Sequence, residues 1–274
     1  MANTYPDPVA KLIQLGIPSQ SWQDYQALGI THEHVPDLIR LLQDDELRLM
    51  VAPEPLDEDE VLPEWYAQVH AWRALGQLGV EEAIPSLLGI LHQIDDDMDD
   101  WLSTEVDDVF VKLGKPAVQP LADYLAEVDN PMYARGAASS SLAAIGITLP
   151  DERNRCIQAI TAVLEKYQEN EEGLNGFMIG DLIEMKAVEQ IDLIKRAFEA
   201  DAVDEMITGD VEDVQIELGL LEKRLTPARA WHPLPGDLIG EPEIPAKKAG
   251  LQQKKEKNKR KQEKKSRKKN RKRK

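Results

Sequence analysis

Apolar side chains recur at helical spacing between about residues 63 and 200. Few segments show the strict alternation of apolar and polar residues that a half-buried strand requires. Ala, Leu, Glu, Gln and Asp dominate the periodic segments, as helices favour, and only 5% of the residues are aromatic. The pattern therefore predicts an all-α protein.

The predicted helices occur in similar pairs. First helices are expected to end at Gly79, Gly114 and Gly146, because glycine just past a helix can adopt the left-handed conformation that satisfies the last carbonyls. A second helix follows each glycine, and Pro85 and Pro120 are expected in the first turns of two of them. Two-helix units of roughly 30 to 40 residues are typical of stacked repeats. We expect a right-handed α-α solenoid of about four helical pairs.

Composition divides the chain into five segments. They are an N-terminal helical cap or degenerate repeat (1–52), an acidic linker (53–62), a helical-repeat solenoid (63–225), a proline-rich linker (226–246) and a basic tail (247–274). The prolines and like charges of the acidic linker oppose regular structure. Within the N-terminal segment, the spacing predicts three helices, over residues 7–15, 22–28 and 31–47.

The net charge of -17 combines two parts of opposite sign. Residues 247–274 hold 17 Lys and Arg and 2 Glu, which gives +15. The rest of the chain therefore holds 33 − 17 = 16 basic and 50 − 2 = 48 acidic residues, which gives -32. The length and the 42% of apolar residues allow this acidic part to bury a core.

The basic tail is the clearest candidate for a function. It has almost no apolar surface to bury, which predicts disorder, and a polycation binds RNA or DNA by releasing counterions without reading sequence. We expect nonspecific contact with nucleic acid or the ribosome, and the alternatives are a solubilising tail and a tail that docks on the acidic part. The candidate residues are Lys254, Lys255, Lys257, Lys259, Arg260, Lys261, Lys264, Lys265, Arg267, Lys268, Lys269, Arg271, Lys272, Arg273 and Lys274.

A run of acids between two repeats forms a second candidate surface, either for the tail or for an external basic partner. Its residues are Asp95, Asp96, Asp97, Asp99, Asp100, Glu105, Asp107 and Asp108. A calcium loop is disfavoured, because the run lacks the Asp-x-Asp-x-Asp-Gly order of an EF-hand. The simplest interpretation is a solvated acidic turn.

Other chemistry is sparse, and we expect no catalytic residue, metal or cofactor. A single cysteine, Cys156, excludes an internal disulfide and a multi-cysteine metal site, and its position in a helix predicts core packing. No His-x-x-x-His pair presents two metal ligands, and His92 beside Asp95 suits a helix end better than a catalytic pair. The start of the sequence lacks the features of a signal peptide, and no apolar run is long enough to span a bilayer. We expect a cytoplasmic monomer without membrane contact.

The run from 66 to 79, followed by 82–88, resembles HEAT-like repeats, also called phycobilisome-lyase-like repeats. Residues 133–138 and 196–214 are also similar to a bacterial group of uncharacterised helical-repeat proteins. Many members of that group end in a zinc-binding cysteine motif like the one of the SecA translocase. Here the tail has no cysteine or histidine, so that zinc function cannot be transferred.

The resemblance implies a non-enzymatic scaffold or adaptor. We expect a protein partner on a concave face formed by the second helices of the repeats. The family name suggests one alternative, a bilin-handling lyase-like protein. Repeats of this type serve many functions, so the resemblance is specific for fold and weak for function.

Overall fold

The computed structural model describes residues 4–51 and 61–227, which contain helices and no strand. The prediction of an all-α protein is confirmed for these residues. The chain divides into a unit of residues 1–225 and a unit of residues 226–274, and the first contains the elements discussed below. None of its described helices combines the length and the apolarity needed to cross a membrane.

The N-terminal segment contains three helices, α1 (Val9–Leu12), α2 (Val35–Leu42) and α3 (Asp45–Arg48). The region after the undescribed residues 52–60 contains eleven more among its described residues. They are α4 (Ala67–Leu78), α5 (Ile84–Gly89), α6 (Gln93–Asp96), α7 (Asp100–Leu113), α8 (Lys115–Ala126), α9 (Met132–Thr148), α10 (Arg153–Leu164), α11 (Glu172–Glu184), α12 (Ile191–Glu199), α13 (Glu205–Thr208) and α14 (Val211–Glu217).

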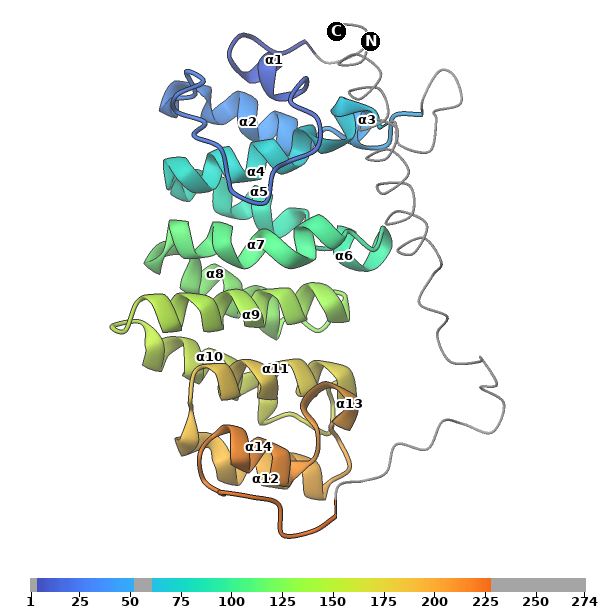
Figure 1. The fold of residues 1–274 in the computed structure, drawn as a ribbon, viewed down its shortest axis with the longest axis vertical. Helices are drawn as coiled ribbons and strands as arrows, with labels where there is room; N and C mark the ends of the chain where they lie inside the picture. Colours follow the sequence, from blue (N-terminus) through green and yellow to red (C-terminus); the bar gives the residue numbers. More distant parts are fainter. Residues whose placement is uncertain (1–3, 52–60, 228–274) are drawn as a thin grey trace, which may run out of the picture. The chain divides into compact units, whose positions relative to one another are not determined.

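The longer helices of the first unit form two layers. One layer contains α4, α7, α9 and α11, each packed against the next, and the other contains α5, α8 and α10. Figure 1 shows α7, α9 and α11 one below another, with α8 and α10 behind them. Helix α9 contacts all four of these helices, so it is the centre of the packing.

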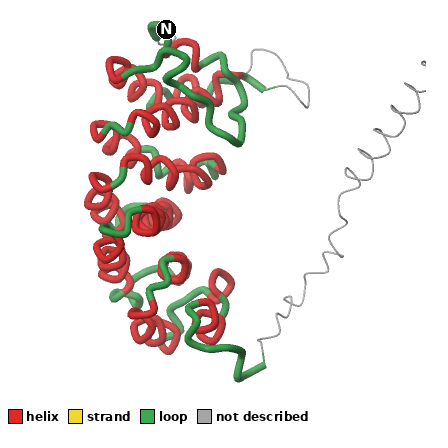
Figure 2. Tube along the Cα trace, turned by 60° about the vertical axis from the view of Figure 1, so that its left-hand side comes forward, coloured by secondary structure: helices red, strands yellow, loops and turns green. Residues whose placement is uncertain are grey.

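The layer of α4, α7, α9 and α11, called the inner layer below, lies on the hollow side of the stack within this unit (Figure 2). We expected the second helices of the repeats to line a concave face. Instead, the first helices do so, and α8 and α10 lie on the outer side. Sequence periodicity does not distinguish the two arrangements, because both helices of a pair bury an apolar stripe.

The three expected helix stops have different outcomes. Gly79 and Gly114 have φ of 66° and 67° and end α4 and α7, as predicted. The prediction for Gly146 is wrong, because this residue lies inside α9. A Cβ at Gly146 would collide with Met185 and lie 3.2 Å from Cys156 Cβ. Glycine is needed there for close helix packing.

Of the two prolines predicted in the first turns of helices, one lies there and one does not. Pro85 lies in the first turn of α5, as predicted. Pro120 lies inside α8, whose first turn instead contains Pro116. The prediction placed the start of α8 too late, because Lys115 follows Gly114 directly and begins the helix there.

The N-terminal segment departs most from its predicted helices. Residues 22–28 are not helical, because tertiary hydrogen bonds hold the backbone: Tyr25 N–H donates to Gln77 Oε1 at 3.0 Å, and Gln77 Nε2 donates to the Gln23 carbonyl at 2.8 Å. The single helix expected over 31–47 is divided into α2 and α3. Asp44 caps the second by accepting from Leu47 N–H at 3.2 Å.

Candidate functional site

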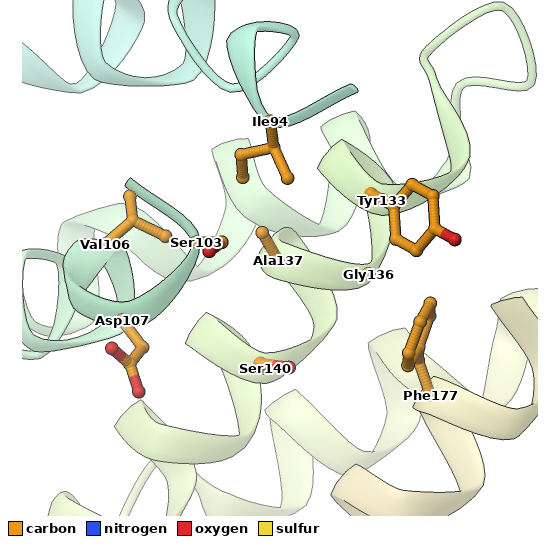
Figure 3. Close-up of a pocket in the computed structure, with 9 residues that line it drawn as sticks. All are labelled: Ile94, Ser103, Val106, Asp107, Tyr133, Gly136, Ala137, Ser140 and Phe177. Atoms are coloured by element: carbon orange, nitrogen blue, oxygen red, sulfur yellow. The ribbon is translucent and has the colours of Figure 1, made fainter. Parts of the chain in front are cut away.

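An open pocket of about 170 Å³ lies on the inner layer, where α6, α7, α9 and α11 meet. Figure 3 shows its lining side chains, with an aromatic pair at one end and a carboxylate at the other. The lining residues are Ile94, Ser103, Val106, Asp107, Tyr133, Gly136, Ala137, Ser140 and Phe177.

Helical spacing brings the lining residues to one place. Tyr133, Gly136, Ala137 and Ser140 follow one another at steps of three, one and three along α9, which is one face of a helix. Residues 103, 106 and 107 form the matching face of α7. Because α7 and α9 pack side by side, the two faces meet.

The aromatic end is formed by Tyr133 and Phe177. Their ring centroids lie 5.8 Å apart at an interplanar angle of 51°, and Tyr133 is 52% exposed. Gly136 allows this packing, because a Cβ at that position would lie 3.0 Å from Phe177 Cδ2. Two aromatic rings are therefore held at the surface of the inner layer.

The polar end depends on a buried carboxyl group behind the pocket wall. Asp181 on α11 is 6% exposed, and it accepts hydrogen bonds from Ser139 Oγ at 2.5 Å and from Ser140 Oγ at 3.0 Å. Asp107 lines the pocket itself, and the Asp108 N–H donates to its Oδ1 at 2.8 Å. We call Asp107, Ser139, Ser140, Asp181 and Glu184 the pocket cluster.

Burial and neighbouring negative charges disfavour the ionised form of the carboxyl groups in the pocket cluster. Burial raises the pKa of Asp181 from 3.8 to about 7, the negative charges of Glu184 and Asp107 act in the same direction, and the serine hydrogen bonds act against it. Burial likewise raises the pKa of Asp107, with Asp108 and Glu184 contributing. No described Lys, Arg or His forms an ion pair with Asp107, Asp181 or Glu184.

A second buried group, called the N-terminal cluster, consists of Tyr25, His70, Arg73 and Glu105. His70 Nε2 lies 2.9 Å from the Gly16 carbonyl, which can only accept, so Nε2 carries the proton and Tyr25 Oη donates to Nδ1 at 2.7 Å. Burial lowers the pKa of His70.

Arg73 and Glu105 form the charged part of the N-terminal cluster. The Arg73 side chain is 1% exposed and the Glu105 side chain 13%. Arg73 Nε donates to Glu105 Oε2 at 2.7 Å, a second guanidinium nitrogen donates to Oε1, and the third donates to the Ser19 carbonyl at 2.9 Å. This pair joins α4 to α7 and to the loop before α2.

Most of the predicted acidic surface has local structural partners. Asp95 caps α9 by accepting from Tyr133 N–H at 3.0 Å and from Ala134 N–H at 2.8 Å. Asp99 accepts from Leu102 N–H at the start of α7. These two carboxylates are therefore engaged with helix ends.

The other acids of that run are divided between ion pairs, the pocket and solvent. Asp97 pairs with Arg48 at 2.5 Å, Glu105 belongs to the N-terminal cluster, and Asp107 belongs to the pocket cluster. Asp96, Asp100 and Asp108 are exposed. Use of this run as an interaction surface stays a prediction.

The remaining predicted residues give little chemistry. Cys156 is buried, as expected, and burial raises the pKa of its thiol to about 11. His92 Nδ1 lies 2.8 Å from the Gly89 carbonyl, and its Nε2 lies 3.9 Å from Asp96 and not beside Asp95. The described part of the chain contains no group of three or more His, Cys, Asp or Glu that could hold a metal ion. The basic tail lies outside the described residues.

Sequence reasoning missed most of the pocket cluster. It named Asp107 only as one acid in a run, and it did not single out Ser139, Ser140, Asp181 or Phe177 as site residues. A signal was present, since the polar residues 139 and 140 interrupt the small and apolar residues of α9. A buried polar group requires a partner, but the sequence does not identify that partner on another helix.

Comparison with known proteins adds a family and no function. The curated proteins and the solved structures gave no match. A family model described as "Protein of unknown function (DUF1186)" matches residues 26–231, a range that includes helices α2 to α14, the pocket cluster and every residue of the N-terminal cluster except Tyr25. The chain, with its two-layered helical unit and inner-layer pocket, therefore belongs to the DUF1186 family.

Proposed function

We propose that this protein is a non-enzymatic scaffold, built as a right-handed HEAT-like solenoid, that binds a protein partner on its inner layer. The observation that carries the proposal is the pocket between α6, α7, α9 and α11, which combines two aromatic rings with a carboxylate. Exposed aromatic side chains on a rigid frame are favourable anchors for a partner, because they bury a large area at a small cost in entropy.

The placement of reactive groups favours binding over catalysis. A covalent mechanism needs a nucleophile beside an oriented base. Cys156 is buried, and the pKa of its thiol is raised. Both ring nitrogens of His70 are engaged in hydrogen bonds, with Tyr25 and with the Gly16 carbonyl, and none of these residues lines the pocket. Ser139 and Ser140 donate hydrogen bonds to Asp181, so both hydroxyl groups have a structural partner.

At the inner-layer pocket, the volume favours a side chain of a partner over a bilin. Clefts that enclose drug-sized ligands measure roughly 300 to 1,000 Å³, whereas this pocket measures about 170 Å³. An open-chain tetrapyrrole would extend well beyond it. Mixing the purified protein with bilin tests the alternative: a stable shift in visible absorbance, resistant to gel filtration, would support the lyase-like class and contradict the scaffold.

The scaffold proposal is tested by affinity capture from cell lysate with single substitutions on the inner layer. Tyr133→Asp places a charge at the exposed aromatic position without emptying the core. Val128→Asp is the matched control, since Val128 is 69% exposed and does not line the pocket. We expect at least one captured protein to be lost with Tyr133→Asp and kept with Val128→Asp. Equal capture by both variants would overturn the proposal.

For the basic tail, we propose nonspecific contact with nucleic acid or the ribosome. The support is its sequence, 17 Lys and Arg in 28 residues. The same capture, performed with and without nuclease on the full chain and on residues 1–246, tests it. Partners lost both with nuclease and with tail deletion support the proposal, whereas partners that are insensitive to nuclease contradict it.

A further inference from the structure

Resting on the proposed scaffold role, we propose that the inner-layer pocket binds the ammonium group of a lysine side chain, presented by an extended lysine-rich segment of another protein. Its floor and polar end are formed by α7 and α9, and its aromatic end by Tyr133 and Phe177 (Figure 3). Hydrogen bonding, ring geometry and charge each support this ligand.

The hydroxyl groups at the polar end offer lone pairs and no protons. Ser140 Oγ donates a hydrogen bond to Asp181 Oδ1 at 3.0 Å, and Ser103 Oγ donates one to the Asp100 carbonyl at 3.1 Å. The third polar group of the lining is Asp107, which in its ionised form has no proton to donate and can only accept hydrogen bonds. A ligand that satisfies all three oxygens must bring several N–H or O–H donors.

Lysine has donors of that number and arrangement. Its ammonium group carries three N–H donors around one nitrogen and can turn them toward separate acceptors. Arginine presents its donors in a planar fork that suits the two oxygens of one carboxylate. The acceptors here are two separate hydroxyl oxygens and one carboxylate, whose Oδ1 already accepts from the Asp108 N–H, so a compact ammonium group fits them better.

The aromatic end suits the rest of a lysine side chain. Its methylene groups can lie along the Tyr133 and Phe177 rings, because apolar stems pack well on such surfaces. A ring face also attracts a nearby ammonium group. Ile94, Val106 and Ala137 add apolar surface to the pocket lining.

Charge balance gives the third line of support. Asp107 lies on the pocket wall and Asp181 directly behind Ser140, yet neither carboxyl group has a cationic partner among the described residues. The buried arginines of the same layer, Arg73 and Arg135, do have carboxylate partners, Glu105 and Glu171. A bound ammonium group would neutralise the repulsion within the pocket cluster.

The occupant is a separate protein and not a free amine, because of the surroundings of the pocket. The pocket is open and small, so a single lysine side chain gains little affinity alone. A segment with neighbouring lysines would also be attracted by the exposed Glu184, whose negative charge acts on Asp107. The part of the chain outside residues 247–274 has a net charge of -32, which steers a basic segment toward it.

The test uses the full chain and a fluorescently labelled peptide of alternating lysine and glycine, with binding measured by anisotropy. We expect Asp107→Asn to weaken binding about tenfold, because the amide keeps the shape of the side chain but loses the charge that attracts the ammonium group. Asp108→Asn is the matched control, because it removes the same charge from the neighbouring, exposed position. It should change the affinity less than about twofold.

Two further arms separate the pocket from general electrostatic attraction. Phe177→Leu should weaken binding several-fold, whereas Phe198→Leu, a partly buried phenylalanine on α12 outside the pocket, should not. The same peptide with every lysine acetylated should not bind, because acetylation removes the charge and donors. Equal losses with Asp107→Asn and Asp108→Asn would overturn the inference.

The outcomes also distinguish this inference from the scaffold proposal. If capture from lysate depends on Tyr133 but the lysine peptide fails to bind, the scaffold stands and the lysine site is wrong. If residues 1–246 bind the peptide at least about tenfold more tightly than the full chain, the chain's own tail is the occupant, and a separate protein is excluded as the partner.

Discussion

The N-terminal cluster and the pocket cluster share helix α7 but differ in charge balance. Glu105 and Asp107 are two residues apart on that helix and face different neighbours. Glu105 meets Arg73 of α4 and forms a nearly solvent-free ion pair. Asp107 lines the pocket beside α9 and forms no ion pair with any of the described residues. One acid connects two helices, whereas the other opens into the pocket.

The difference supports the proposal that the N-terminal cluster serves the fold and the pocket cluster serves binding. In the N-terminal cluster, every charged or ring nitrogen discussed above has a hydrogen-bond partner within the chain. In the pocket cluster, burial raises the carboxyl pKa values of Asp107 and Asp181, and neighbouring carboxylates act in the same direction. Strongly perturbed groups beside a pocket are typical of functional sites.

Removing the arginine of the N-terminal cluster should cause the largest loss of stability. Arg73→Met leaves Glu105 buried without a counter-charge, which costs about 3 to 5 kcal/mol of unfolding free energy. Urea denaturation measures it. The double variant Arg73→Met with Glu105→Leu should recover most of the loss, because the unpaired charge is gone. A single variant within about 1 kcal/mol of the wild type would show that this ion pair does not connect α4 to α7.

Removing the buried carboxyl group of Asp181 should raise the stability of the protein, whereas removing Arg73 should lower it. The folded pKa of Asp181, about 7, lies above its ordinary 3.8, so the folded protein binds more protons in that interval and loses stability as the pH rises through it. Asp181→Asn removes this loss. We expect the variant to gain stability relative to the wild type between about pH 4 and 7, by at most about 4 kcal/mol.

The gain should then remain constant above about pH 7, where Asp181 is ionised in both states. Urea midpoints measured at several pH values follow this course. Asp108→Asn, at an exposed position, is the control and should show a flat difference. A stability difference for Asp181→Asn that is independent of pH would contradict the assignment of an uncompensated carboxyl group.

The uncharged part of the N-terminal cluster should give an intermediate effect. Tyr25→Phe deprives the buried His70 Nδ1 of its donor at 2.7 Å, which should cost about 1 to 3 kcal/mol. Tyr133→Phe, with an exposed side chain, is the control and should cost much less. Thermal denaturation at neutral pH compares them, and equal melting temperatures for the two variants would contradict the role of Tyr25.

The pH dependence of His70 should be opposite to that of Asp181. Its folded pKa is lowered below its ordinary 6.5, so the unfolded chain binds the proton first and stability is lost as the pH falls below about 6.5. His70→Gln should therefore reduce the loss of stability on acidification. An unchanged acid limb in the stability profile would show that His70 is not the group responsible.

The smallest effect tests whether part of the acidic run is structural. Asp95→Ala removes the carboxylate that caps α9, at a cost of about 1 kcal/mol. Asp96→Ala, next to it and exposed, should cost less than about 0.5 kcal/mol. Chemical denaturation of the two variants side by side provides the measurement. Equal stability would show that the contacts of Asp95 with α9 do not stabilise the fold.

Local sequence rules succeeded where a local conformation decided the outcome. Gly79 and Gly114 end helices because glycine adopts positive φ without strain, and Pro85 begins one because its missing N–H is not needed there. The same rules failed at Gly146 and over residues 22–28. At Gly146 the packing of Met185 and Cys156 decides, and at 22–28 the hydrogen bonds to Gln77 decide.

The candidate site was only partly accessible from sequence for the same reason. The run containing Asp107 was visible as a charge pattern, but its members differ in role according to the helix that each one faces. Nothing along the chain indicates that Ser139 and Ser140 meet Asp181, about forty residues later. Such contacts depend on the register between α9 and α11, which side-chain packing sets.

Sequence alone was enough to predict a helical protein whose charge is divided between an acidic part and a basic tail, because periodicity, propensity and composition are local properties. Tertiary structure was needed to place α4, α7, α9 and α11 in the inner layer, to bring Glu105 to Arg73 and to open Asp107 into a pocket where no described residue supplies a cation. Two residues on one helix acquire different environments because neighbouring helices, and not the chain around them, supply the partners.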